Sequence, residues 1–207
     1  MRVDLSLRSI RDALAQYEHE KADLRGVDRR AAVAAVLRPG ASGRMEDAEV
    51  LLMRRADRDS DPWSGHMSFP GGHLEAGEDF EMAARRETFE EVGLDLERHG
   101  RMLGELDHSH AIARGRQLNM VIAPIVYELV SEPPPLVLNY EVAETFWTPL
   151  APMLRGDAHT MLEYEMDGER RSFPGYDVDG RVVWGLTYRM LGTLFSILHP
   201  NWEPVDF

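Results

Sequence analysis

One stretch of the sequence, from Phe69 to Leu94, constrains the fold more than any other. It begins with Phe-Pro-Gly-Gly and has a further glycine at Gly77, so the backbone can turn tightly there and bring main-chain groups up to a ligand. The segment 80–92 predicts a helix, and Gly93 stands where a helix commonly ends. The stretch therefore predicts a glycine-proline turn that leads into a helix.

The predicted helix carries three glutamates on one face. At about 100° per residue, Glu87, Glu90 and Glu91 fall within an arc roughly 100° wide. Like charges at this spacing repel each other by a few tenths of a kcal/mol per pair. A divalent cation would reverse that repulsion, because Mg²⁺ and Mn²⁺ prefer carboxylate oxygens. A solvated acidic face is the alternative, and the nearby Arg86 and Glu78 favour the cation site.

These residues also match a known pattern. Residues 72–94 resemble the Nudix box, G-x5-E-x7-R-E-U-x-E-E-x-G-U, in which U is a bulky aliphatic residue. The first U position holds Thr88, a departure that touches no charged position. The matching residues are Gly72, Glu78, Arg86, Glu87, Glu90, Glu91, Gly93 and Leu94.

The resemblance implies an α+β fold, a Nudix-type α/β/α sandwich with a mixed sheet and a catalytic loop-helix-loop. It implies hydrolysis of a nucleoside diphosphate linked to another group, with Mg²⁺ or Mn²⁺ as cofactor. Glu87 and Glu91 are the implied direct metal ligands, Glu90 would ligate or position a further ion, and the Gly71 carbonyl would assist.

Such a site needs a group that takes a proton from the attacking water. The general base of the resembled enzymes often lies outside the helix, and Glu144 and Glu141 are our two candidates. Either could equally be a surface residue of a strand. Glu90 and Arg86 complete the predicted catalytic set, because Arg86 can orient a neighbouring carboxylate.

Residues upstream of the box are expected to decide the substrate. Residues 51–56 and 65–72 resemble the coenzyme A-type signature LLTxR(S/A)-x3-R-x3-G-x3-FPGG, and residues 184–191 resemble the C-terminal helix of that subgroup. Met53 replaces the threonine and Asp61 stands where an arginine is expected, although Arg58 could supply that charge. The expected substrate is coenzyme A or a derivative, cleaved to 3',5'-ADP and 4'-phosphopantetheine.

Other substrates and another class of function stay open. ADP-ribose, dinucleotide or damaged-nucleotide hydrolysis is the enzymatic alternative, and a Nudix-like module that binds a nucleotide without cleaving it is the other. Trp63 could form a substrate wall or could equally cap the core. The predicted substrate-binding residues are Arg55, Arg30, Trp63, Phe69, Gly71 and Gly72.

The composition of the chain limits the classes of molecule that it is expected to bind. The 207 residues carry a formal net charge of -13. Such a field repels nucleic acid, so the expected partner is a small nucleoside diphosphate derivative. The absence of cysteine excludes disulfides and thiolate metal sites. Without a signal-peptide pattern or an apolar run of about 18 residues, we expect a cytoplasmic protein that does not bind membranes; a homodimer is possible.

The remaining sequence predicts one domain over residues 1–207, with residues 1–28 as a helical extension packed on it. Apolar residues at helical spacing predict a helix over 5–21. His108 and His110 are expected in a loop, and no third metal ligand stands at an obvious spacing from them, which favours a structural role. Strands are predicted at 31–37, 49–55, 101–107, 117–129, 141–147, 161–166, 169–173 and 181–184, and further helices at 150–155 and 186–198.

Overall fold

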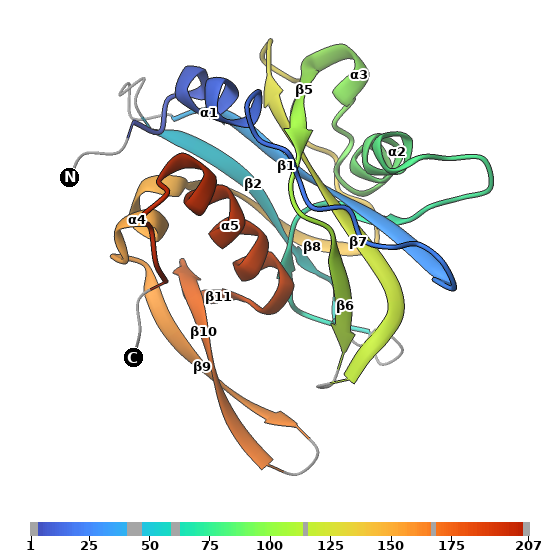
Figure 1. The fold of residues 1–207 in the computed structure, drawn as a ribbon, viewed down its shortest axis with the longest axis vertical. Helices are drawn as coiled ribbons and strands as arrows, with labels where there is room; N and C mark the ends of the chain where they lie inside the picture. Colours follow the sequence, from blue (N-terminus) through green and yellow to red (C-terminus); the bar gives the residue numbers. More distant parts are fainter. Residues whose placement is uncertain (1–3, 41–46, 59–62, 114–115, 167–168, 205–207) are drawn as a thin grey trace.

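The computed structural model describes residues 4–40, 47–58, 63–113, 116–166 and 169–204 (Figure 1). The helices of these residues are α1 (Leu7–Leu14), α2 (Phe80–Val92), α3 (Leu96–His99), α4 (Leu150–Arg155) and α5 (Gly185–Leu198). The strands are β1 (Arg29–Pro39), β2 (Ala48–Arg55), β3 (Met67–Ser68), β4 (Gly71–His73), β5 (Gly100–Glu105), β6 (Ser109–Ala113), β7 (Arg116–Leu129), β8 (Val142–Pro149), β9 (His159–Met166), β10 (Glu169–Val178) and β11 (Arg181–Trp184). None of the described helices has both the length and the apolar character needed to cross a membrane.

The first sheet is arranged around β1. This strand runs parallel to β7 and antiparallel to β2 and β4. The strand order is β3-β2-β1-β7-β5, with β4 also on β1, β6 on β7 and β8 on β2. Parallel strands need a long crossover between them, and α2 lies in the crossover from β1 to β7. The mixed sheet with its helices confirms the expected α+β fold.

Helices cover both faces of β1 because its side chains alternate between the faces. Ala32 and Val36 lie in a buried cluster with Ala84 of α2. Ala35 and Leu37 lie in the other cluster, which contains the apolar side of α5. Figure 1 shows α2 and α5 on either side of β1. This is the α/β/α arrangement that the sequence pattern implies.

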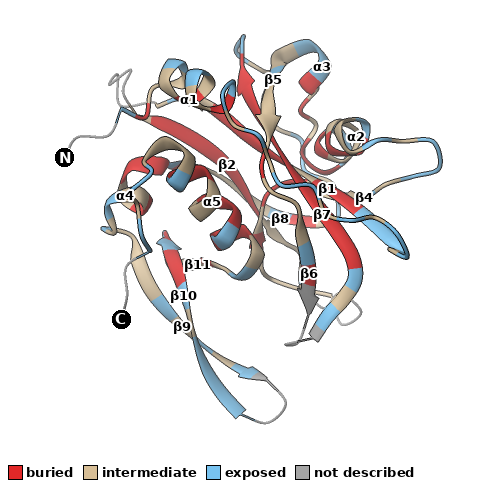
Figure 2. Cartoon of the chain, in the orientation of Figure 1, coloured by how far each residue is buried: buried red, intermediate tan, exposed pale blue. Residues whose placement is uncertain are grey.

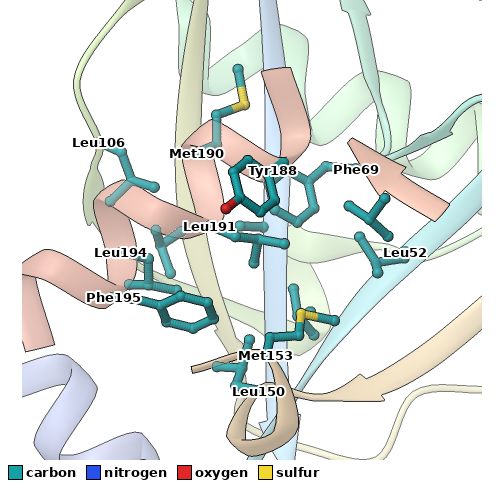
Figure 3. Packing of buried hydrophobic residues seen from close by; sticks show 14 of the residues in the cluster. Leu52, Phe69, Leu106, Leu150, Met153, Tyr188, Met190, Leu191, Leu194 and Phe195 are labelled. Atoms are coloured by element: carbon teal, nitrogen blue, oxygen red, sulfur yellow. The ribbon is translucent and has the colours of Figure 1, made fainter. Parts of the chain in front are cut away.

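The apolar side of α5 fills the second of these clusters. Tyr188, Leu191 and Phe195 come from successive turns of α5, and Figure 3 shows them packed together with the sheet residue Leu52 and with Phe69. Each fully buried side chain of this kind contributes roughly 1.5–3 kcal/mol relative to an exposed one. The apolar helix predicted at residues 186–198 is confirmed by α5. Burial of this face accounts for its apolar residues.

A separate sheet of three strands, β9 to β11, lies beside the first. β9 and β10 form an antiparallel hairpin, and β11 pairs with the other edge of β10. β11 also contacts β3 at the edge of the first sheet. The predicted hairpin strands are confirmed, while the Asp-Gly turn at 167–168 lies outside the described residues. Figure 2 shows that the far half of the hairpin is exposed and that β10 becomes buried close to β11.

The N-terminal segment differs from its prediction. The expected helix over 5–21 is wrong in length, because α1 ends at Leu14 and the chain continues without a helix to β1. The hydroxyl of Tyr17 donates to Asp107 Oδ1 at 2.6 Å, and the backbone N–H of Glu20 donates to the same oxygen at 2.7 Å. The second bond satisfies a backbone N–H that a longer helix would otherwise pair internally. The assignment of residues 1–28 as an extension of a single domain stays a prediction.

The segment after β5 also differs from its prediction. The loop expected around His108 and His110 is wrong for most of its length, because β6 begins at Ser109 and pairs antiparallel with β7. The long strand β7 offers backbone partners to β1, β5 and β6 together. β6 and β7 are neighbours in the sequence, but β6 has no alternation of apolar and polar residues that would predict a strand.

Candidate active site

Two glycines lie where the chain passes between β1 and α2. Gly71 has a φ of +152°, and a Cβ added to it would lie 2.2 Å from the carbonyl oxygen of Ala32 in β1. A Cβ on Gly72 would lie 2.4 Å from Glu87 Oε1. Any larger residue at Gly71 would push β4 off β1, and any larger residue at Gly72 would displace the Glu87 carboxylate. The glycines thus hold the turn against the glutamate helix.

Side chains and backbone fix both ends of α2. Asp79 accepts a hydrogen bond from the backbone N–H of Met82 at 2.8 Å, and Gly93 ends the helix at a φ of +70°. Thr88, the departure from the aliphatic pattern, is fully buried and donates to the Ala84 carbonyl at 2.7 Å. Its hydroxyl is satisfied within the helix, so the departure leaves the packing of α2 intact.

Glu91 is a carboxylate held almost out of contact with water. Its side chain is 2% exposed. The backbone N–H of Gly71 donates to its Oε2 at 2.7 Å, and Arg55 Nη1 lies 3.9 Å from its Oε1. Burial raises the pKa of Glu91 to about 8, although the Gly71 N–H and the Arg55 charge both act to lower it. A second positive charge beside this carboxylate would therefore be strongly favoured.

Arg86 organises the other glutamates of the helix. Its Nε donates to Glu78 Oε1 at 2.7 Å, and its Nη1 lies 3.0 Å from Glu87 Oε1 and 3.1 Å from Glu90 Oε2. Its Nη2 also donates to the His73 carbonyl at 2.9 Å, which ties the helix to β4. The Arg86 bond lowers the pKa of Glu78, whereas burial raises the pKa of Glu87 against the opposing effect of Arg86.

A cavity of about 540 Å³ lies in front of this helix. Its volume is in the range of small-molecule sites, about 300–1,000 Å³. The cavity brings together most of the predicted site residues, which are Arg55, Trp63, Phe69, Gly71, Gly72, Glu87, Glu91 and Glu141. Trp63 lines the cavity and also packs against the buried cluster of α5, so both of its expected roles are compatible with its position.

Four predicted site residues do not line the cavity. Arg86 acts through its contacts with the glutamates, and Glu90 points outward with a side chain 52% exposed. Glu144 is paired with Arg54 at 3.1 Å and with Arg181. Arg30 is exposed at the start of β1. The catalytic or binding roles of these four residues stay predictions.

Glu141 lies at the cavity, unlike its neighbour Glu144. Its Oε1 accepts a hydrogen bond from Arg58 Nη1 at 2.9 Å, and its charge acts on Glu87 and Glu91. Its backbone carbonyl accepts the N–H of Ala56 at 2.7 Å, which fixes its place beside β2. Of the two candidate bases, Glu141 is therefore the one that faces the glutamate helix.

The cavity residues offer a suitable set of donors for Mg²⁺ or Mn²⁺. Glu87 and Glu91 present hard carboxylate oxygens, and burial raises the pKa of each despite the neighbouring arginines, so a further cation would be favoured. The four-residue spacing of these two places them on adjacent turns of α2. The donor chemistry therefore fits the cation that the sequence pattern implies.

A different cluster also brings three potential metal-ligating side chains close together. Among the described residues, His19, Glu105 and His108 bring their ligand atoms within 4.8 Å of one another. This cluster joins the N-terminal segment to β5 and does not line the cavity. His108 Nδ1 accepts the backbone N–H of Ala22 at 3.3 Å, so Nε2 carries the proton in the neutral ring and faces Glu105 Oε2 at 3.2 Å. The arrangement fits a structural hydrogen-bond cluster, the role favoured for His108.

The sequence did not predict the aromatic part of the cavity lining. This aromatic wall consists of His66 before β3, Tyr164 of β9, Phe173 of β10 and Trp184 of β11. The only signal in the sequence was a cluster of aromatic residues on the strands of a predicted hairpin. Their convergence depends on the register between strands, which local pattern does not give.

Comparison with known proteins places this site in a family. The model described as the NUDIX domain matches residues 28–164. An uncharacterized protein of Schizosaccharomyces pombe is 34% identical over 160 residues, which are 75% of this chain and 47% of that protein. A peroxisomal coenzyme A diphosphatase of Caenorhabditis elegans is 34% identical over 118 residues, which are 56% of this chain and 47% of that protein. The chain spans about half the length of these curated relatives.

A solved structure shares the fold at low sequence identity. A MutT/nudix family protein from Enterococcus faecalis aligns with a TM-score of 0.50 and 18% identity, covering 93% of this chain and 68% of that one. The matched family region contains the glycine turn, the glutamate helix and the strands of the first sheet. Because that region makes up most of the chain, the protein belongs to the Nudix family.

Proposed function

We propose that this protein hydrolyses the pyrophosphate bond of a nucleoside diphosphate derivative, and that the substrate is coenzyme A or one of its derivatives. The observation that carries the hydrolase proposal is the buried Glu91 carboxylate at the cavity wall, next to Glu87 and Gly71. Burying an incompletely paired carboxylate costs stability. A divalent cation offsets that cost, and a module that merely binds a nucleotide has no need of the arrangement.

Each residue of the site has a role in this proposal. Glu87 and Glu91 would hold Mg²⁺ or Mn²⁺, and the bound ion would supply positive charge that neutralises charge developing on phosphate oxygens. Arg86 keeps the Glu87 carboxylate in place, and Arg55, at the cavity wall, binds an oxygen of the pyrophosphate. Glu141 accepts a proton from the attacking water, which requires its carboxylate to lie within hydrogen-bond reach of that water.

The choice of coenzyme A rests on two observations outside the geometry of the helix. The segments 51–56 and 65–72 carry most of the coenzyme A-type signature. A relative described as a coenzyme A diphosphatase matches this chain at 34% identity. Asp61, the main departure from the signature, lies outside the described residues, but Arg58 contributes a cation beside Glu141 at the cavity.

A substrate panel tests the proposal. The purified protein is incubated with Mg²⁺ or Mn²⁺ and, separately, with coenzyme A, ADP-ribose, a diadenosine polyphosphate and an oxidised nucleoside triphosphate. Products are identified by mass spectrometry. We expect 3',5'-ADP and 4'-phosphopantetheine from coenzyme A, and loss of this turnover when the cation is chelated.

The outcomes separate the alternatives. Turnover of ADP-ribose or the dinucleotide without turnover of coenzyme A would overturn the substrate while keeping the hydrolase. Folded protein that binds nucleotides but cleaves none of the panel would favour the non-catalytic module. A Glu91→Gln variant run in parallel shows whether any turnover belongs to this site.

A further inference from the structure

The aromatic wall of the cavity is built around Trp184. The ring of Trp184 lies 4.8 Å from that of His66, 4.9 Å from that of Tyr164 and 5.2 Å from that of Phe173, all measured between centroids. All four rings also line the cavity that contains Glu87. A single cavity is therefore lined both by carboxylates and by four aromatic rings. We call the part lined by Glu87 and Glu91 the acidic end and the part lined by the four rings the aromatic chamber.

The three-stranded sheet carries three of these rings, those of Tyr164, Phe173 and Trp184. Arg171, Phe173 and Gly175 lie on one face of β10, since side chains alternate along a strand. Arg171 pairs directly with Tyr164, and Gly175 pairs with Trp184. A Cβ on Gly175 would meet the Val183 carbonyl oxygen at 2.8 Å, so glycine allows β11 to lie close enough to place Trp184 in the wall.

Two arginines of β10 and α5 line the same cavity. Arg171 lines it from β10 and is partly neutralised by Glu169, whose Oε2 lies 3.1 Å from Arg171 Nη2. Arg189 lines it from α5 and is exposed. Among the ion pairs of the described residues, none involves Arg189. An arginine with this freedom, in a protein of net charge -13, is available to an anionic ligand.

We propose that the aromatic chamber binds the purine base of the substrate and that Arg189 binds a phosphate monoester on its ribose. Ring faces favour a planar base, because stacking adds to the gain from burying apolar area, whereas a flexible saturated arm gains from area alone. A guanidinium favours a phosphate oxygen. The orientation of the whole substrate rests on the proposed function. In that orientation the pyrophosphate lies at Glu87 and Glu91 and the phosphorylated nucleoside lies in the chamber.

The chamber can be tested by ligand binding, without turnover. Adenosine 3',5'-bisphosphate and AMP differ by the 3'-phosphate, and their affinities are measured by titration calorimetry on the folded protein. We expect the wild type to bind the bisphosphate more tightly than AMP. Arg189→Gln should weaken the bisphosphate about ten-fold and leave AMP nearly unchanged, as expected for loss of one charge-assisted contact. Trp184→Leu should weaken both ligands about ten-fold through loss of stacking.

A matched variant controls for net charge. Arg170→Gln removes the same charge from the neighbouring position of β10, which faces away from the chamber by strand alternation. It should bind both ligands like the wild type. If Trp184→Leu does not fold, as judged by circular dichroism, Tyr164→Leu replaces it with the same expectation, because Tyr164 lies on the exposed hairpin.

The outcomes are distinguishable from those of the hydrolysis panel. The inference is overturned if the wild type binds the two ligands equally or binds neither. It is also overturned if Arg189→Gln still prefers the bisphosphate over AMP as strongly as the wild type does. Wild-type affinity in the folded aromatic variant would do the same. Discrimination that depends on Arg189, in a protein that does not cleave coenzyme A, would keep the chamber and reject the proposed substrate.

Discussion

At the scale of single residues, Glu91 combines two properties that do not favour stability. It is buried, and its pKa is raised to about 8, so its charge is poorly compensated. Stability alone would favour a neutral side chain at this position. The carboxylate is therefore better explained by a function that uses its charge, and a substitution that keeps its shape separates the two effects.

We expect Glu91→Gln to lower kcat/KM by about a hundred-fold or more, the range seen when a group that acts on developing charge is removed. The amide oxygen can still accept the Gly71 N–H, so the metal-free variant should be at least as stable as the wild type. Steady-state kinetics and thermal unfolding in a chelator check the two parts. Wild-type turnover would show that Glu91 is not a metal ligand.

The two candidate bases can be distinguished in the same assay. Glu141→Gln should lower kcat by about a hundred-fold, within the range for general bases, because Glu141 lines the cavity. Glu144→Gln should change kcat less than about ten-fold, since Glu144 is bound to Arg54 and Arg181 away from the cavity. A larger loss in Glu144→Gln than in Glu141→Gln would reverse the assignment.

His159 predicts one part of the pH dependence of stability. Burial lowers the pKa of His159, whose Nε2 lies 3.0 Å from the Tyr188 hydroxyl. The unfolded chain takes up this proton near its ordinary pKa of about 6.5, before the folded protein does. Stability from this group is thus complete above pH 6.5 and is lost as the pH falls through the lower folded pKa. Melting temperatures at pH 7.5 and 5.5 should differ less in His159→Gln than in the wild type; an equal difference would contradict this assignment.

At the scale of helices and strands, sequence predicted the elements whose signals are local. α2 was predicted because its periodicity, its cap and Gly93 lie within one stretch, and α5 because its apolar positions repeat at helical spacing. β6 was missed and α1 was given too many residues. The bond from Tyr17 to Asp107 joins segments far apart in the chain, so no local pattern encodes it. β6 pairs with the next strand, β7, but lacks the alternation of apolar and polar residues that would predict a strand.

The candidate site divides in the same way. The glycines and glutamates of residues 71–91 could be predicted because their spacing along a turn and a helix fixes their geometry. The meeting of Tyr164 with Trp184 could not, since it depends on the register of β9, β10 and β11. Likewise, Glu141 and Glu144 were indistinguishable until the bulged pairing of β8 with β2 placed them in different surroundings.

The attachment of α1 gives a prediction about an element. Glu128 of β7 is 2% exposed and is bound by Arg11 of α1 and by Arg101 of β5. Glu128→Gln should lower the free energy of unfolding by about 1.5–3 kcal/mol, the range for a hydrogen bond to a charged group. Both arginines are about half exposed and can return to water, so a larger loss is not expected.

Urea unfolding measures this loss, and Arg8→Gln is the matched control. Arg8 is exposed on the same helix, so its replacement should change stability by less than about 0.5 kcal/mol. A loss of that small size in Glu128→Gln would mean that apolar packing of Ile10 and Leu14, both buried, holds α1 in place without the ion pairs.

At the scale of the whole molecule, the cavity lies where separate parts of the structure meet. Its acidic end comes from α2 and the glycine turn, within the region that matches the NUDIX domain. The aromatic chamber combines His66 and Tyr164, which lie within that region, with β10, β11 and α5, which follow it in the chain. The first sheet lines the cavity with Val33 and Ile122. A ligand that fills this cavity must therefore contact all three parts at once.

This arrangement predicts how ligand binding changes local stability. With Mg²⁺ and adenosine 3',5'-bisphosphate at about 100 times the dissociation constant, amides that exchange by opening of the cavity walls should exchange up to about a hundred-fold more slowly. Hydrogen exchange followed by mass spectrometry should show this protection in both α2 and β10–β11, while α1, which lies outside the cavity, should change little. Protection restricted to α2 and β4 would mean that the ligand occupies the acidic end alone and that the three-stranded sheet takes no part in binding it.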